Sequence, residues 1–157
     1  MTNRNCCKQI AEARIKGINA YPKITGYVKF EQLQKGVLVT AQIHGLPFNA
    51  DNCNPIYAFH IHSGNSCGGN NEDPFADAGG HYNPQNTQHP HHAGDLPPLF
   101  GNHGYAFLSV FTDRFTVSEI VGRVAIIHKN FDDFTSQPAG NAGAKIACGK
   151  ILWKNRP

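Results

Sequence analysis

The chain has 157 residues, of which 40% are hydrophobic and 16% are charged. This length fits one domain with a hydrophobic core of its own. The formal charge of +3 is spread along the chain without a lysine- and arginine-rich run, and no apolar stretch approaches membrane-spanning length. Composition therefore argues against nucleic-acid binding and against a membrane-spanning helix.

The beginning of the chain carries no apolar signal core, so we expect a cytoplasmic protein. No linker composition and no internal repeat interrupts the sequence after that. We therefore expect residues 1–9 to form a mobile N-terminal segment and residues 10–157 to form a single domain.

Strand patterns recur along the whole chain. Apolar and polar side chains alternate over residues 10–17, and Lys35-Gly36 supplies the turn of a hairpin. The expected strands cover residues 10–17, 24–33, 37–43, 56–62, 105–112, 121–129 and 144–153. Short strands separated by turn residues, in a chain with 16 glycines and 10 prolines, favour an all-β Greek-key β-sandwich or flattened barrel.

Two long segments show no sustained period, residues 63–102 and residues 131–143. Irregular runs of the first length inside a compact domain are either functional or disordered. The first segment is rich in histidine and aspartate as well as in glycine, proline and asparagine. We therefore predict two long loops, the first of them held in shape by an ion that it binds.

The donors for such an ion are grouped along the sequence. His60 and His62 are two residues apart on an expected strand, so their side chains point to the same face. Further donors follow in the loop: His81, His89, His92 and Asp95. The last three are spaced three residues apart, and a folded loop can gather them around one cation. The donors are numerous enough for two metal sites.

Ordered motifs give the chain a family resemblance. They are FHIH at 59–62, GGHYNP at 79–84, HAGDLP at 92–97, IIHKNFDD at 126–133 and GNAGAKIACG at 140–149. Together they resemble the copper–zinc superoxide dismutases over roughly residues 10–152, and the short interval from His62 to Cys67 is similar to that of bacterial-type members. The resemblance implies an eight-stranded Greek-key barrel with two long functional loops.

The resemblance also implies the cofactors, copper and zinc, and their ligands. It assigns copper to His60, His62, His81 and His128. Four imidazole nitrogens suit the tetragonal preference of Cu(II) and tolerate Cu(I) with one bond lost. It assigns zinc to His81, His89, His92 and Asp95, a closed four-coordinate set. His81 is in both sets because the family shares one imidazolate between the two metals.

Two ligand assignments have neighbouring rivals. His91 stands beside His92, and the HxxD spacing together with the family's HxGD motif favours His92. Asp132 corresponds to the aspartate through which the family links one copper histidine with one zinc histidine, and Asp133 is its rival. Carboxylates commonly orient metal-bound histidines in this way.

Lys145 occupies the position at which the family has an arginine above the copper, where the arginine guides and hydrogen-bonds the superoxide anion. Lysine keeps the charge but loses the planar, bidentate fork of the guanidinium group. We therefore predict retained but slower turnover. A plain surface lysine is the alternative.

The five cysteines fall into two groups. The resemblance implies a disulfide between Cys67 and Cys148, which would contribute about 4–5 kcal/mol on the chain-entropy model because it closes a long loop. Cys6, Cys7 and Cys53 are expected to be free thiols, with a second bridge or thiol metal capture as alternatives.

The function implied by the resemblance is superoxide disproportionation. Cu(II) takes an electron from one superoxide and Cu(I) returns it to a second, while His81 leaves copper, gains a proton and delivers it. His81 and Lys145 are thus the expected catalytic residues. Superoxide is the expected partner, and a copper donor and a second copy of the chain are candidate partners. The alternative is a non-catalytic relative that buffers or delivers copper or zinc.

Overall fold

The computed structural model describes residues 9–52 and 55–155. Cys6, Cys7 and Cys53 lie outside the described residues, as does almost all of the predicted mobile N-terminal segment. Among the described helices, none has the length and apolar character needed to cross a bilayer.

Eight antiparallel strands make up the protein, and the prediction of an eight-stranded all-β fold is confirmed. The strands are β1 (Ile10–Gly17), β2 (Thr25–Leu33), β3 (Gly36–His44), β4 (Ile56–His62), β5 (Asp95–Phe100), β6 (Ala106–Thr112), β7 (Val124–His128) and β8 (Lys145–Asn155). The helices of the described residues are a short 3-10 helix, η1 (Ala76–Ala78), and a one-turn α-helix, α1 (Val117–Ile120).

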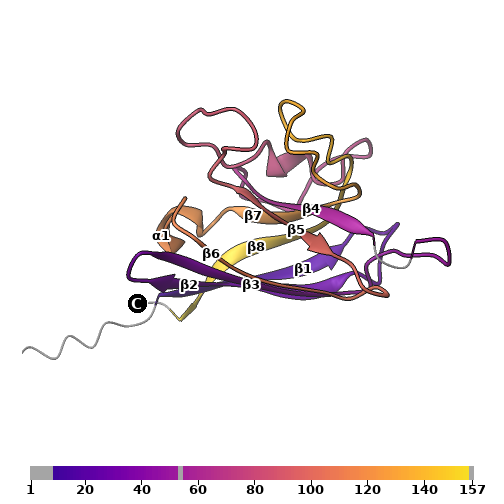
Figure 1. The fold of residues 1–157 in the computed structure, drawn as a ribbon, viewed down its shortest axis with the longest axis horizontal. Coiled ribbons are helices and arrows are strands. Elements are labelled where there is room, and N and C mark those ends of the chain that lie inside the picture. The colour runs from indigo at the N-terminus through magenta and orange to yellow at the C-terminus, as the bar shows by residue number, and fades with distance from the viewer. Residues whose placement is uncertain (1–8, 53–54, 156–157) are drawn as a thin grey trace, which may run out of the picture.

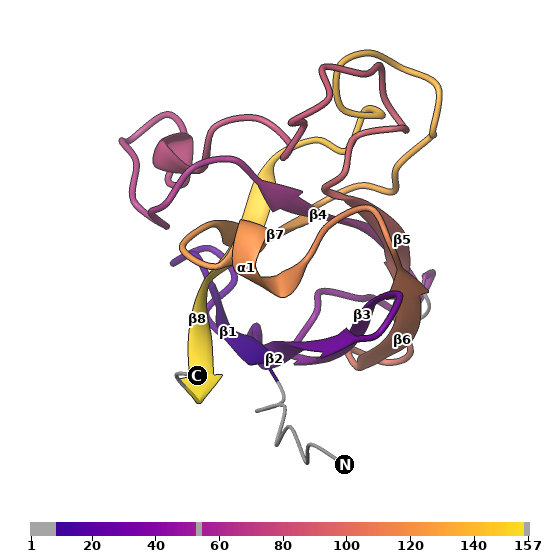
Figure 2. The same ribbon diagram turned by 90° about the vertical axis from the view of Figure 1, so that its left-hand side faces the viewer.

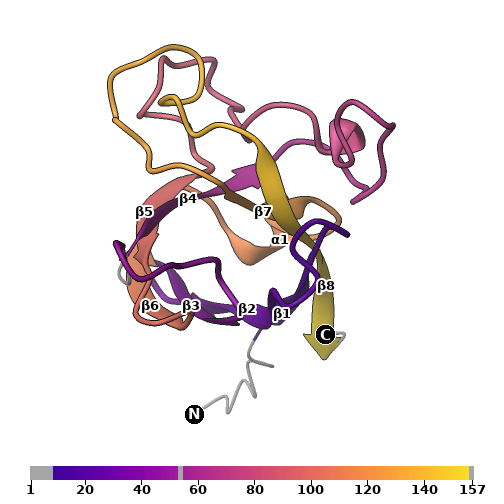
Figure 3. The same cartoon turned by 90° about the vertical axis from the view of Figure 1, so that its right-hand side faces the viewer.

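The strands form one sheet in the order β5-β4-β7-β8-β1-β2-β3-β6. The sheet curls until its two edge strands, β5 and β6, come to lie side by side, which gives a nearly closed barrel (Figures 2 and 3). The chain passes from β3 to β4 and from β6 to β7 across an end of the barrel, and these crossings are the Greek-key connections.

Alternation along the strands fills the barrel with apolar side chains. In β1, Ala11, Ala13 and Ile15 are buried in the core, and the residues between them are more exposed. In β4, Phe59 and Ile61 join the same core. Because side chains alternate on a strand, the histidines of β4 point to the outside of the barrel. They are nevertheless buried, since loops cover this part of the wall.

The two long loops supply that cover. The loop between β4 and β5 and the loop between β7 and β8 both stand outside the barrel, on the side of β4 and β7 (Figure 1). The predicted disulfide is present and joins Cys67 of the first loop to Cys148 of β8. A small second core lies beneath this loop and includes Phe75 and Ala78.

The prediction was wrong about β5, which lies inside the segment 63–102 that we expected to be irregular. Pro97 and Pro98 stand in the middle of this strand and lack the N–H groups that a ladder needs. The strand tolerates them because it is at the edge of the sheet and pairs only with β4. The expected strand 121–129 is also shorter than predicted and begins at Val124, after α1.

Candidate metal centre

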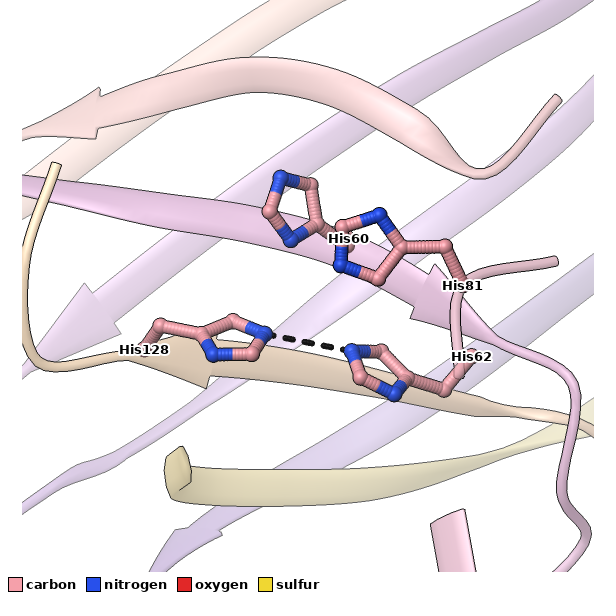
Figure 4. A group of neighbouring side chains, drawn as sticks. All are labelled: His60, His62, His81 and His128. Atoms are coloured by element: carbon pink, nitrogen blue, oxygen red, sulfur yellow. Dashed lines mark hydrogen bonds between the residues drawn. The ribbon is translucent and has the colours of Figure 1, made fainter. Parts of the chain in front are cut away.

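Four histidines from separate parts of the chain meet outside the barrel wall. His60 and His62 come from β4, His128 ends β7, and His81 is brought in from the long loop through a bridge to His62. One ring nitrogen from each lies within 4.8 Å of the others. Figure 4 shows the rings gathered together, with those of His62 and His128 directed at each other.

The hydrogen bonds of His62 and His128 fix which ring nitrogens carry protons. Nδ1 of His62 lies 2.7 Å from the carbonyl of Gly79, and Nδ1 of His128 lies 3.1 Å from the carbonyl of Gly143. A carbonyl oxygen only accepts, so both Nδ1 atoms donate and both Nε2 atoms carry lone pairs in the neutral rings. These two Nε2 atoms face each other at 3.1 Å, along the dashed line of Figure 4. Two facing acceptors repel unless a cation lies near both.

The other two rings show the same need for a cation. Nδ1 of His60 and Nε2 of His81 are buried and have no hydrogen-bond partner. A buried polar atom without a partner is costly in free energy. A bound metal ion removes that cost by accepting the lone pair, so this donor set fits copper, for which imidazole is a suitable ligand.

A second group of donors shares His81 with the first. It consists of His81, His89, His92 and Asp95, again with ligand atoms within 4.8 Å of one another. Nδ1 of His81 lies 2.7 Å from Oδ1 of Asp95, whereas Nδ1 of His89 lies 3.1 Å and Nδ1 of His92 lies 3.3 Å from Oδ2. Three nitrogens and one oxygen around a small space fit four-coordinate zinc.

Asp132 connects the two groups through hydrogen bonds. Its Oδ2 accepts from Nε2 of His60 and its Oδ1 accepts from Nε2 of His89, both at 2.8 Å. Asp133, the rival, instead accepts from Ser136 and Thr135 and shapes its own loop. His91, the rival of His92, is exposed and is in neither group of donors.

Comparison with known proteins agrees with this geometry. The profile of the copper/zinc superoxide dismutase family matches residues 24–151. A superoxide dismutase [Cu-Zn] of Aquifex aeolicus is 34% identical over 91% of this chain and 88% of its own length. The enzyme of Photobacterium leiognathi is 33% identical, over 82% and 79%, and that of Legionella pneumophila is 36% identical, over 83% and 79%.

The chain belongs to the copper/zinc superoxide dismutase family. Copper and zinc are accordingly its cofactors, and the predictions of family and cofactors are confirmed. These three relatives are bacterial, in agreement with the predicted bacterial type.

Burial keeps the histidines of this superoxide dismutase in their neutral, metal-binding form. Loss of hydration lowers the pKa of His128 to about 3 and lowers that of His62 well below the ordinary value. The same effect lowers the pKa of His60 and of His92. A neutral imidazole offers a lone pair, so these side chains need not release a proton at neutral pH before they bind a metal.

The carboxylate of Asp132 stays charged although it is buried. Burial by itself raises the pKa of Asp132, but hydrogen bonds from His60, from the Phe134 N–H and from His89 outweigh it and lower the pKa to about 2. A charged carboxylate holds the imidazole N–H groups firmly and makes the opposite ring nitrogens better donors to metals. Gly140 allows this close approach, since a Cβ there would meet Oδ1 of Asp132 at 1.9 Å.

Lys145 lies at the cavity in front of the copper group. Its side chain is 16% exposed, and it lines a space of about 420 Å³ together with His62, His81 and His128. Nζ of Lys145 forms an ion pair with Oδ2 of Asp73, and sequence reasoning missed this partner. The two residues are far apart in sequence, and nothing in the local pattern of either indicates the contact.

Sequence reasoning also missed Arg114, which holds the zinc loop from outside. Its Nη1 donates to the carbonyls of Pro90, His92 and Asp95 at 3.2–3.3 Å. Two of these carbonyls belong to residues of the zinc group. The only sequence signal is a single arginine after β6, which is too common a feature to indicate a role.

Proposed function

We propose that this protein disproportionates superoxide to dioxygen and hydrogen peroxide. The observation that carries the proposal is the arrangement of acceptor nitrogens around one shared ring. Nε2 of His62 faces Nε2 of His128 at 3.1 Å, and His81 belongs to both groups of donors. The shared ring places the copper group and the zinc group side by side, as the family match leads one to expect.

The ligand assignments follow from the positions of the lone pairs. Copper would be held by Nδ1 of His60 and by Nε2 of His62, His81 and His128. Zinc would be held by Nδ1 of His81, His89 and His92 and by the carboxylate of Asp95. When bound, copper supplies reversible one-electron transfer, which allows one superoxide to be oxidised and a second to be reduced.

The protein supplies orientation, charge and a proton. Nε2 of His81 is the atom that would hold the proton for the reduced product when it is free of copper. Nδ1, which faces Asp95 within the zinc group, would keep the ring from turning away. Lys145 lies at the cavity, and its ammonium group draws in the anion. Salt should weaken this attraction, since dissolved ions screen it. Turnover slower than in arginine-bearing relatives stays a prediction.

The test is the decay of superoxide after pulse radiolysis, with copper- and zinc-loaded protein. We expect fast decay in the wild type and its loss in His128→Ala, which removes one side of the facing pair while leaving the zinc donors in place. Decay no faster than with metal-free protein would refute the proposal.

One observation favours a second candidate function, that of a non-catalytic copper and zinc carrier. The ammonium of Lys145 is already paired with a carboxylate, so less of its charge is available to an anion. Such a carrier would exchange copper with a chelator within minutes at neutral pH and would show no superoxide decay in the radiolysis experiment. A catalyst would retain its copper through dialysis.

Partners and location complete the proposal. We expect a homodimer, supported by the large aromatic side chains exposed on the edge strands, Phe100, Phe107 and Phe111. Analytical ultracentrifugation of metal-loaded protein tests it. We also propose a copper donor as a partner and a cytoplasmic location, and cell fractionation tests the latter.

A further inference from the structure

Lys145 stands between two neighbouring spaces at the surface. On one side is the cavity of about 420 Å³ that His62, His81 and His128 line. On the other is a space of about 530 Å³ lined by Asp73 and its loop, and Lys145 borders this one as well. The ammonium group therefore stands between the copper cavity on one side and the Asp73 carboxylate on the other.

The carboxylate of Asp73 is held in place by its own loop. Oδ1 of Asn70 accepts from the N–H groups of Glu72 and Asp73, which fixes a tight turn. Oδ1 of Asp73 accepts from the Phe75 N–H at 3.0 Å, which leaves Oδ2 free to meet Lys145. Phe75 is buried in the small core beside Cys148, so this turn is anchored to β8, the strand that carries Lys145.

The pair is charged and only partly screened by solvent. The side chain of Asp73 is 40% exposed. Burial raises the pKa of Asp73, but the hydrogen bond and charge of Lys145, together with the hydrogen bond from the Phe75 N–H, outweigh it and hold the pKa below its ordinary value. A carboxylate and an ammonium in contact have no net charge, and their combined field on an anion in the copper cavity falls off faster than that of the ammonium alone.

We propose that Asp73 is a positioning residue for the reaction: it restrains Lys145 at the mouth of the copper cavity and weakens the attraction of that lysine for small anions. Asp73 belongs to neither group of metal donors, and its ion pair is with Lys145. The inference rests on the proposed function, because it assigns the anion-attracting role to Lys145. The proposal predicts that the protein binds small anions more weakly than it would if Lys145 had no carboxylate partner.

Azide binding tests the inference without superoxide. Azide is a small monovalent anion, and its binding to the copper- and zinc-loaded protein is followed by optical titration. We expect Asp73→Asn to raise the azide affinity about three- to tenfold, because the lysine charge is no longer offset. Asparagine keeps the side-chain oxygen that accepts from the Phe75 N–H, so the turn should survive.

Glu72→Gln is the matched control. It removes the same charge from the neighbouring residue, which is exposed and makes no ion pair with Lys145 among the described contacts. We expect this variant to change azide affinity less than about twofold. Equal gains in both variants would overturn the proposal in favour of a general loop charge. No gain, or a loss, in Asp73→Asn would overturn it as well.

A double variant separates an effect through the lysine from a direct effect. In a Lys145→Met background, adding Asp73→Asn should leave azide affinity within about twofold of the single variant, because the group that Asp73 restrains is absent. A gain as large as in the wild-type background would contradict the proposal, since Asp73 would then act on the anion by itself.

A second readout uses metal-free protein and so does not depend on copper. Acetic anhydride labelling followed by peptide mapping measures the reactivity of Lys145. We expect Asp73→Asn to raise its labelling several-fold, with Glu72→Gln unchanged; equal labelling in all three proteins would overturn the restraint. Failure of the proposed function alone would abolish superoxide decay and leave these binding and labelling differences intact.

Discussion

One carboxylate, that of Asp132, orients a histidine in each metal group. It accepts from Nε2 of His60 and from Nε2 of His89, both at 2.8 Å, and it is almost fully buried. The loop turn formed by Asp133 places it there, because Asp133 binds the following N–H groups and curls the chain. The two neighbouring aspartates thus have different roles: Asp133 shapes the loop, and Asp132 orients the histidine rings.

Asp132→Asn should weaken both metal sites. An amide can accept from only one imidazole N–H, and its NH2 group opposes the other. We expect the affinities for copper and zinc to fall about 10- to 100-fold, the usual cost of losing such a carboxylate. Competition with a chromophoric chelator measures this. Asp133→Asn, which keeps the oxygen that accepts from the Thr135 and Ser136 N–H groups, is the control. If it weakens the sites as much as Asp132→Asn does, the connecting role of Asp132 is refuted.

Histidine burial makes the stability of the metal-free protein depend on pH. The pKa of His128 is about 3 in the folded protein and about 6.5 in an unfolded chain. Its contribution to the free energy of unfolding is therefore complete above about pH 6.5 and is lost as pH falls towards about 3. Urea unfolding between these limits should show this loss.

The His128→Gln variant identifies the source of that dependence. Without the imidazole, the slope of unfolding free energy against pH should fall by about one proton, or about 1.4 kcal/mol per pH unit. His91→Gln, the loss of an exposed histidine, is the control. An unchanged slope in His128→Gln would show that other groups cause the acid sensitivity.

The elements that carry the site differ in how visible they are in the sequence. The alternation of β4 predicts that His60 and His62 share a face, and the structure places both on the outer face of that strand. The edge strand β5 escaped prediction because two prolines mask its pattern. Whether a strand is at an edge is decided by the rest of the sheet, so no local rule could have found it.

Contacts between distant segments form the second limit of sequence reasoning. The pair of Lys145 with Asp73 and the contacts of Arg114 with the zinc loop join residues that are far apart in the sequence. The space that Gly140 leaves for Asp132 depends on how their shared loop folds back on itself. The family motifs carry the metal donors, and they say nothing of these supports. Each support depends on how the loops fold over the barrel.

The contacts of Arg114 with the zinc loop lead to a prediction about zinc affinity. Arg114→Gln removes a donor that reaches two carbonyls of the zinc loop and that of Asp95 at the start of β5, so the loop should hold its donors less firmly. We expect zinc affinity to fall about tenfold, with a smaller effect on copper. Arg14→Gln, which removes the same charge from an exposed site on β1, should leave both affinities unchanged. Equal losses in the two variants would contradict the role of Arg114.

At the scale of the molecule, a rigid barrel carries two loops that have little regular structure of their own. Among the connections that hold them are the Cys67–Cys148 disulfide, the small core around Phe75 and the metal groups, which draw donors from the barrel and the first loop. Asp132 ties the second loop to the same histidines. The site is therefore assembled only when the loops are in place. Loss of a connection should affect the loops before the barrel.

Removal of the disulfide should affect the loops more than the barrel. The bridge spans 81 positions of sequence, for which chain entropy gives at most about 4–5 kcal/mol. We expect the Cys67→Ser, Cys148→Ser double variant to keep its strand content by circular dichroism, to unfold at lower urea concentration and to bind zinc more weakly. Unchanged urea and zinc titrations would show that the bridge does not hold the loop.

The central claim is that one imidazole, that of His81, is shared by two metals. Crystals of the metal-loaded protein, with anomalous diffraction recorded at the copper and the zinc absorption edges, test it most directly. The account predicts one copper peak next to Nε2 of His81 and one zinc peak next to Nδ1 of the same ring. A single peak, or two peaks of which one is out of contact with that ring, would contradict it.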